Sequence, residues 1–235
     1  MKTYLAFSAR RREGYPNPAR ESLTYDHDTA AIKTEGVDAF LNTYGGPAGE
    51  FIRFTKEAKF ARLDGEEVPV GTKLIVVFPE TQHGWIKFNG PGHPPTRHMG
   101  GMFSGYVPPP RSELGDNDPS SWEEGLSGKP QDPWKSQVLL PLKEAEGERL
   151  FIFQTSSATG LRAVASLISE CKQMSKREPD AYPVVELAIG AFEHKDPRVG
   201  TVKKPAFKIV GKVSRDGVAA PQIGAGAVMD DEIPF

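Results

Sequence analysis

The sequence predicts a mainly β (α+β) fold, a small Greek-key barrel of short strands with one packed helix. Three observations predict it. Short segments of alternating or β-branched apolar residues recur from residue 50 onward. Glycine and proline number 24 and 21 among 235 residues, so much of the chain must be loop and turn. Only residues 157–177 show a long helical period.

Some seven strands are expected from these segments. The β-branched run at 73–78 is typical of a buried strand. Residues 137–142 and 150–155 flank a polar turn at 144–148, which predicts a hairpin. A further short segment is suggested at 58–62. The remaining predicted strands are 50–56, 84–88, 182–190 and 205–213.

The predicted helix carries a single apolar stripe. Ser156 or Ser157 is the expected N-cap. Cys171 is the only cysteine, so no intramolecular disulfide can form, and we expect a small buried thiol in a reducing compartment. The stripe consists of Leu161, Val164, Ala165, Leu167, Ile168 and Cys171.

An oligonucleotide-binding (OB) barrel is the commonest small barrel of this kind, and a two-sheet sandwich is the alternative. The chain then divides into an N-terminal arm or extension, an OB-like core, a linker and a tip. A short helix is expected within the arm, from Ile32 to Tyr44. The predicted parts are 1–46 (arm), 47–213 (core, with a mobile acidic loop at 108–133), 214–228 (flexible linker) and 229–235 (acidic tip).

Charge is distributed unevenly along a chain whose formal net charge is −2. Residues 150–213 hold ten Lys and Arg against six acids, whereas 111–133 hold two against six. The last seven residues carry three acids and no base. A basic second half followed by an acidic end is the asymmetry on which the functional interpretation depends.

The end of the chain combines three chemical handles. Asp230, Asp231 and Glu232 are negative, Ile233 and Phe235 are apolar anchors, and Pro234 stiffens the backbone between them. Such a peptide fits an apolar pocket with a basic rim on a partner protein. The alternative is an acidic tail that only aids solubility.

The sequence Asp-Asp-Glu-Ile-Pro-Phe resembles the C-terminal peptide of bacterial single-stranded DNA-binding proteins. The body instead resembles a group of uncharacterised phage and prophage proteins. The resemblance implies a phage-type single-stranded DNA-binding protein that recruits replication, recombination and repair proteins through its tip. The resembling stretches of the body are 111–116, 128–134, 155–157 and 182–187.

Non-specific binding of single-stranded DNA needs cations for the phosphates and aromatic faces for the bases. Aromatic residues next to cations are therefore the candidates, with Trp85 and Trp134 favoured as groove walls and Trp122 ranked lower because it lies among acids. For each phenylalanine a core position is the more common alternative. The predicted contact residues are Arg53, Phe54, Lys56, Lys73, Trp85, Lys87, Phe88, Trp134, Lys135, Arg162, Lys203, Lys204, Phe207 and Lys208.

Enzyme motifs are not recognisable. His83, His93 and His98 do not have the spacing of a zinc site, and residues 155–161 lack the glycine and lysine spacing of a P-loop. We therefore expect no enzyme activity, no metal and no cofactor. The chain has neither a signal peptide nor a membrane-spanning run, which predicts a cytoplasmic protein, in the host cytoplasm if phage-encoded.

Two functions remain open at this stage. The first is sequence-nonspecific binding of single-stranded DNA with partner recruitment by the tip, in which the acidic tip also competes with DNA for the basic groove. The second is an adaptor or inhibitor without DNA affinity that uses the tip to engage host replication proteins. A homo-oligomer is compatible with both.

Overall fold

A computed structural model describes residues 49–90, 93–125, 128–216 and 218. All of them belong to one compact unit, residues 35–235. The predicted arm, most of the linker and the tip lie outside the described residues. Within the described part the fold is mainly β with one α-helix, as predicted.

Within the described residues ten strands form a single sheet. Eight of them lie in the order β10-β9-β4-β7-β8-β1-β2-β3, and the other two, the β5–β6 hairpin, pair through β5 with β7. The strands are β1 (Glu50–Phe54), β2 (Phe60–Arg62), β3 (Glu67–Val68), β4 (Lys73–Val76), β5 (Gln82–Lys87), β6 (Thr96–Gly101), β7 (Trp134–Glu144), β8 (Leu150–Thr155), β9 (Ala181–Glu193) and β10 (Thr201–Ser214). The helices are α2 (Ala158–Arg177) and the 3₁₀ turns η1 (Phe78–Glu80), η2 (Arg111–Glu113) and η3 (Pro119–Ser121).

The predicted hairpin of β7 and β8 is confirmed and forms the centre of the sheet. β4 pairs with the C-terminal end of β7 and β5 pairs with its N-terminal end. The turn η1, with Pro79 near its start, separates β4 from β5. β4 and β5 therefore act as one bent strand along the same edge of β7.

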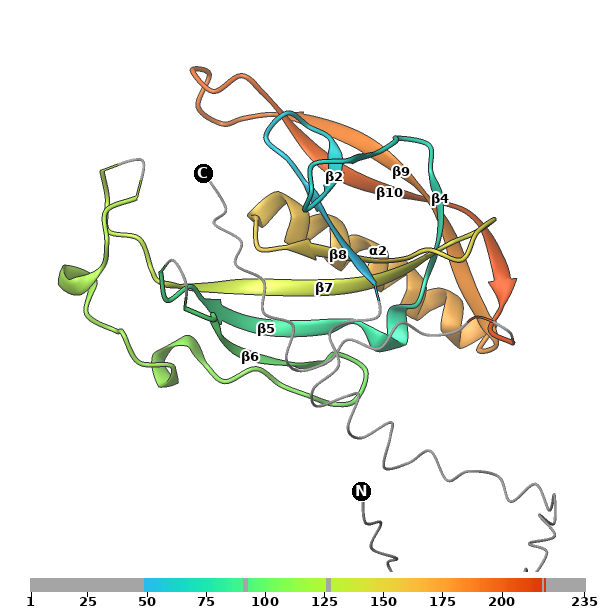
Figure 1. The fold of residues 1–235 in the computed structure, drawn as a ribbon, viewed down its shortest axis with the longest axis horizontal. Helices are drawn as coiled ribbons and strands as arrows, with labels where there is room; N and C mark the ends of the chain where they lie inside the picture. The colour runs from blue at the N-terminus through green and yellow to red at the C-terminus, as the bar shows by residue number, and fades with distance from the viewer. Residues whose placement is uncertain (1–48, 91–92, 126–127, 217, 219–235) are drawn as a thin grey trace, which may run out of the picture. The chain divides into compact units, whose positions relative to one another are not determined.

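The sheet curls into a half-barrel, as Figure 1 shows. Phe207 of β10 and Phe60 of β2 come from strands near opposite ends of the sheet order, yet their ring centroids are 6.1 Å apart. Phe153 of β8 lies 5.2 Å from Phe207 and 6.0 Å from Phe60. These rings fill the space across which the curled sheet faces itself.

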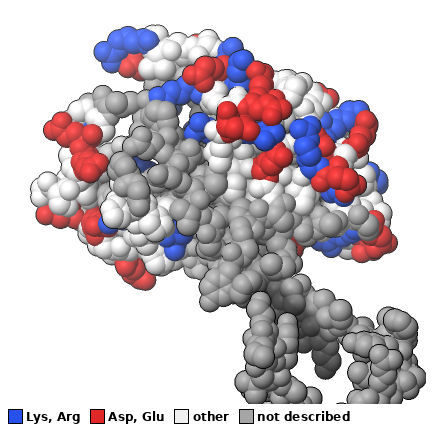
Figure 2. Space-filling view, viewed as in Figure 1, with Lys and Arg blue, Asp and Glu red and all other residues white. Residues whose placement is uncertain are grey.

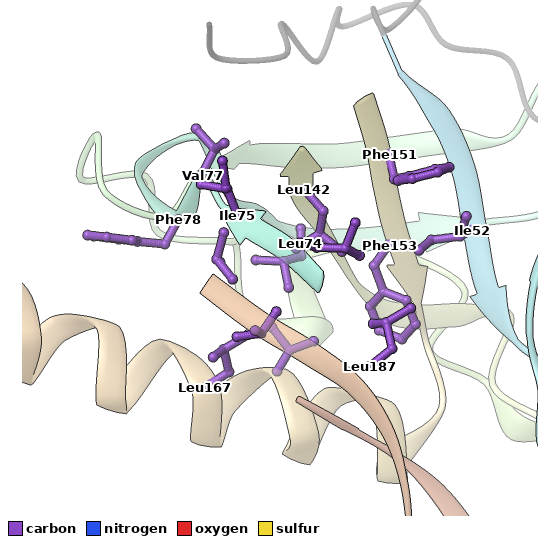
Figure 3. Packing of buried hydrophobic residues seen from close by; sticks show 14 of the residues in the cluster. Ile52, Leu74, Ile75, Val77, Phe78, Leu142, Phe151, Phe153, Leu167 and Leu187 are labelled. Atoms are coloured by element: carbon purple, nitrogen blue, oxygen red, sulfur yellow. The ribbon is translucent and has the colours of Figure 1, made fainter. Parts of the chain in front are cut away.

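The core lies inside the curl and against one side of α2 (Figure 3). Val164, Leu167 and Cys171, the buried residues of the predicted stripe, pack there. Ser157 caps the helix by accepting a hydrogen bond from the Gly160 amide at 3.1 Å, which confirms one of the two predicted caps. Burial raises the pKa of the Cys171 thiol to about 12, so this cysteine is an apolar core group.

Side-chain hydrogen bonds tie down the segment from Met102 to Pro133, which contains the acidic loop predicted at 108–133. Arg111 donates two hydrogen bonds to the Asp132 carboxylate, at 2.7 and 2.8 Å, and so joins the two ends of the segment. Asp116 accepts from Lys87 at 2.8 Å and from the Trp134 indole at 3.1 Å. Asp116 and Asp132 are therefore anchors that hold the connection against β5 and β7.

Replacing Asp116 with Asn should loosen this connection, because a neutral amide pairs poorly with the Lys87 ammonium. We expect faster cleavage within residues 117–131 under limited proteolysis with the endoproteinase Glu-C. The hydrogen bond from Lys87 lowers the pKa of Asp116, so the same loosening should appear as the pH falls through that lowered value. Glu113→Gln is the control, because the Glu113 side chain forms no ion pair or hydrogen bond with any other described residue. Equal cleavage of both variants and wild type would contradict the anchoring role.

Candidate nucleic-acid interface

Three predicted cations share one face of the sheet. In the paired strands Lys73 lies opposite Glu186, and Glu186 lies opposite Lys208. Lys204 follows on the same face of β10, because side chains four residues apart on a strand point the same way. Phe207 points into the core, so this face is the outer one. We call Lys73, Lys204, Lys208, Glu186 and Phe192 the basic face.

The lysines of the basic face outnumber its one acid, Glu186, which lies between Lys73 and Lys208. Lys73 and Lys208 are exposed, and none of the three lysines forms an ion pair with another described residue. Other surface cations differ. Lys212 bonds to Glu178, and Arg198 lies 2.7 Å from Asp196. Unpaired cations on an exposed strand are available to phosphate oxygens.

Phe192 supplies an aromatic ring beside these lysines. It lies opposite Val202, two residues along β10 from Lys204, which places it diagonal to Lys204 on the same face. Gly190 lies directly opposite Lys204, and an added side-chain carbon there would come within 3.1 Å of Lys204 Cε. The lysine stem therefore lies across the glycine. Sequence reasoning missed Phe192, because only the strand register shows its neighbours.

Lys203 projects from the opposite face of β10, where it lies across from Ala191. Lys195 and Arg198 lie between β9 and β10, and Figure 2 shows cations at the tip of this hairpin. Over the rest of the side drawn in Figure 2, cations and acids are interspersed. Arg198 is paired with Asp196, so Lys195 is the cation by which the hairpin tip extends the positive charge of the basic face.

Two predicted stacking residues lie in the core. Phe207 packs among Phe60 and Phe153, and Phe54 packs edge-on to Phe60 with ring centroids 5.2 Å apart. Both phenylalanines therefore serve packing, the alternative raised for residues on alternating strands. The structure does not support a stacking role for either ring.

The predicted groove walls are also engaged within the protein. Trp134 is 5% exposed and has no face open to a base, so its predicted role is not supported. The Trp85 indole donates to the Pro109 carbonyl at 2.9 Å. Lys87 is paired with Asp116, and Phe88 follows it at the end of β5. The bonds of Trp85, Lys87 and Trp134 hold the 102–133 connection in place.

Trp122 lies within that connection, with the Arg111 guanidinium 5.9 Å from its ring centroid.

The remaining predicted contacts do not join the basic face. Arg53 lies on β1 and Lys56 is exposed in the turn that follows it. Lys135 lies on β7, where burial lowers its pKa. Arg162 is exposed on the first turns of α2. The predicted set is therefore spread over several surfaces, and the structure gathers only Lys73, Lys204 and Lys208 on one of them.

Two glutamines on the outer face of the β7–β8 hairpin were also not predicted from the sequence. Gln137 of β7 is 1% exposed and Gln154 of β8 is 7% exposed. Among the residues that the structure describes, neither Gln137 amide atom has a hydrogen-bond partner, and Gln154 Oε1 also lacks one. Buried amides without partners are rare because their desolvation is not compensated.

Replacing Gln137 with Met, which has a similar shape, should raise the free energy of unfolding by about 1–2 kcal/mol. The gain comes from removing two buried polar atoms that have no partners. Urea unfolding followed by tryptophan fluorescence measures it. Gln173→Met, at an exposed position of α2, should change stability by less than about 0.5 kcal/mol. A loss of stability in Gln137→Met would show that the amide is satisfied in solution.

No cluster of three or more metal-ligating side chains occurs among the described residues. No helix in the same part of the chain is long and apolar enough to cross a membrane. Neither a family model, a curated protein nor a solved structure matches the chain.

Proposed function

We propose that this protein belongs to the class of single-stranded nucleic-acid-binding proteins, with the basic face as its phosphate-binding surface. More particularly, we propose a sequence-nonspecific single-stranded DNA-binding protein of phage type, whose tip recruits replication, recombination and repair proteins. The observation that carries the proposal is the set of three lysines, Lys73, Lys204 and Lys208, that shares one outer face with Phe192 and forms no ion pair within the described part of the chain.

The strand order supports an OB-like barrel. Three antiparallel strands follow one another (β4–β5, β7 and β8), and after α2 the chain returns in β9 to lie beside β4. The spatial order β9-β4-β7-β8 corresponds to the 4-1-2-3 order that defines a Greek key. We therefore assign β4–β5, β7, β8, β9 and β10 to the five barrel strands.

In an OB barrel oligonucleotides contact the second and third strands and the loops after strands one and four. Under our assignment the second and third strands are β7 and β8, and the two loops are residues 88–133 and the β9–β10 hairpin tip. The lysines of the basic face lie on β4 and β10, outside the second and third strands, and the basic face meets the OB-type contact surface at that hairpin. A strand that follows it would meet Lys208, Lys204 and then Phe192 over about 20 Å. The spacing suits a single strand whose phosphates and bases contact the surface in turn.

The tip supports the same role through its chemistry. Ile233 and Phe235 would anchor in an apolar pocket of a partner while the acids meet a basic rim. The segment before the tip holds many small residues, so it can carry the tip to a partner while the body stays on DNA.

Binding of labelled oligo(dT) by the full chain tests the proposal, with a duplex of equal length as control and two salt concentrations. We expect tight binding to the single strand, weak binding to the duplex, and a loss of affinity as salt rises. Failure to bind oligo(dT) at low salt would overturn it. That result would favour the adaptor function, for which the near-neutral charge of the whole chain is the supporting observation.

A further inference from the structure

An apolar groove of about 330 Å³ runs between α2 and the sheet. Met102 and Val138 form one side of it. The other side comes from successive turns of α2. Its principal lining residues are Met102, Val138, Leu161, Val164, Ile168 and Lys172.

The groove joins apolar surface to positive charge. Lys172 is the one charged residue among the described residues that line it, and this exposed side chain forms no ion pair with any of the others described. Lys176 and Arg177 follow within the next turns of α2 and are also exposed. An apolar channel that ends at cations fits a peptide with apolar anchors next to acids.

We infer that the groove binds the C-terminal tip of the same chain. Ile233 and Phe235 occupy the apolar channel, and Asp230, Asp231 and Glu232 lie beside Lys172 and Lys176. The tip is the one stretch of the sequence that ends in this combination of groups. The inference concerns a surface distinct from the basic face and holds whether or not the protein binds DNA.

The end of β10 lies close enough for the tip to reach the groove. The Arg215 guanidinium lies 5.8 Å from the Phe78 ring centroid, and the Phe78 ring lies 5.4 Å from that of Phe103. Met102, the residue before Phe103, lines the groove. Residues 219–235 can span up to roughly 60 Å when extended. The chain therefore has ample length to place its last residues in the groove.

Docking within one chain has a regulatory consequence. A short tether raises the effective concentration of the tip at the groove to about the millimolar range, so weak contacts suffice. A partner protein must then compete with α2 for the tip. Recruitment would depend on the partner's affinity relative to this internal site.

A disulfide-trapping experiment in the full chain tests the inference. Ser169, which lines the groove, is replaced by Cys together with Glu232→Cys, because the residue before Ile233 comes within disulfide reach of Ser169 in the docked tip, and both tip anchors remain. Cys171 does not interfere because its thiol is buried and its pKa is raised to about 12. Under mild oxidation we expect rapid intramolecular disulfide formation, seen as a monomer of increased mobility on a non-reducing gel.

The control places the helix cysteine at Glu170, which is exposed and does not line the groove. Removing Glu170 also removes an acid that repels the tip, so this control is biased against the expected result. Trapping should be at least about tenfold slower there, since only the tether favours it. Adding Ile233→Ala and Phe235→Ala to the Ser169→Cys chain should slow trapping to the same rate, and circular dichroism of each variant checks that it folds.

Equal rates for the two helix positions would overturn the inference, as would trapping that ignores the loss of Ile233 and Phe235. A disulfide-linked dimer as the main product would also overturn it, because the tip would then come from a second copy.

Discussion

Replacing Phe60 with alanine is expected to lower the free energy of unfolding by about 3–5 kcal/mol. Phe60 is fully buried and contacts the rings of Phe54, Phe153 and Phe207. These rings come from β1, β8 and β10, so one side chain joins strands from both ends of the sheet order. Truncating it leaves a cavity at the place where the curl closes.

Urea unfolding followed by tryptophan fluorescence measures the change. Phe103→Ala is the matched control, because Phe103 is 42% exposed and contacts one ring, that of Phe78. It should lower stability by about 1 kcal/mol or less. If Phe60→Ala cost no more than Phe103→Ala, the aromatic cluster would not hold the half-barrel together.

Replacing Lys73, Lys204 and Lys208 together with alanine is expected to weaken oligo(dT) binding by about tenfold to a hundredfold at low salt. Each lysine that neutralises a phosphate releases counterions from a single strand. The slope of log affinity against log salt should therefore fall by about 2. Fluorescence anisotropy across a salt series measures both quantities.

The control variant removes the same number of charges from cations that already pair with acids: Lys59 with Glu67, Arg149 with Glu144, and Lys212 with Glu178. Exposed pairs of this kind contribute little to stability, so both triple variants should fold. The control should keep most of the affinity and most of the slope. Equal losses in the two variants would mean that net charge, rather than the basic face, governs binding.

Local periodicity was sufficient to predict the elements whose apolar residues recur at a regular spacing in the sequence. The stripe of α2 and the runs of β7 and β8 are of this kind, and all three elements form near the predicted bounds. Their patterns agree with their burial because each element packs one face on the core. The helix cap was predictable for the same local reason.

β6 shows what local pattern cannot predict. Thr96–Gly101 contains two glycines, an arginine and a histidine, and its strand conformation depends on pairing with β5. β9 and β10 likewise extend beyond their predicted bounds because they pair with each other along a long hairpin. Such pairing is a property of the assembled sheet.

The candidate site was harder to predict than the fold. Trp134 next to Lys135 has the sequence of a groove wall, yet Asp116, eighteen residues earlier, accepts a hydrogen bond from its indole and the ring is buried. Phe192 stands without cationic neighbours in sequence and gains Lys204 only through the register of β9 and β10. Whether a residue faces a ligand depends on contacts between distant segments, which a single sequence does not contain.

Hydrogen exchange of the full chain, with and without saturating oligo(dT), tests the central claim most directly. The outer edge of β10 pairs with no described strand, so its amides should exchange readily in the free protein. A bound strand on the basic face should slow exchange across residues 186–208, with little change in α2. Binding without protection of residues 186–208, or protection confined to other segments, would contradict the assignment of the basic face as the DNA-binding surface.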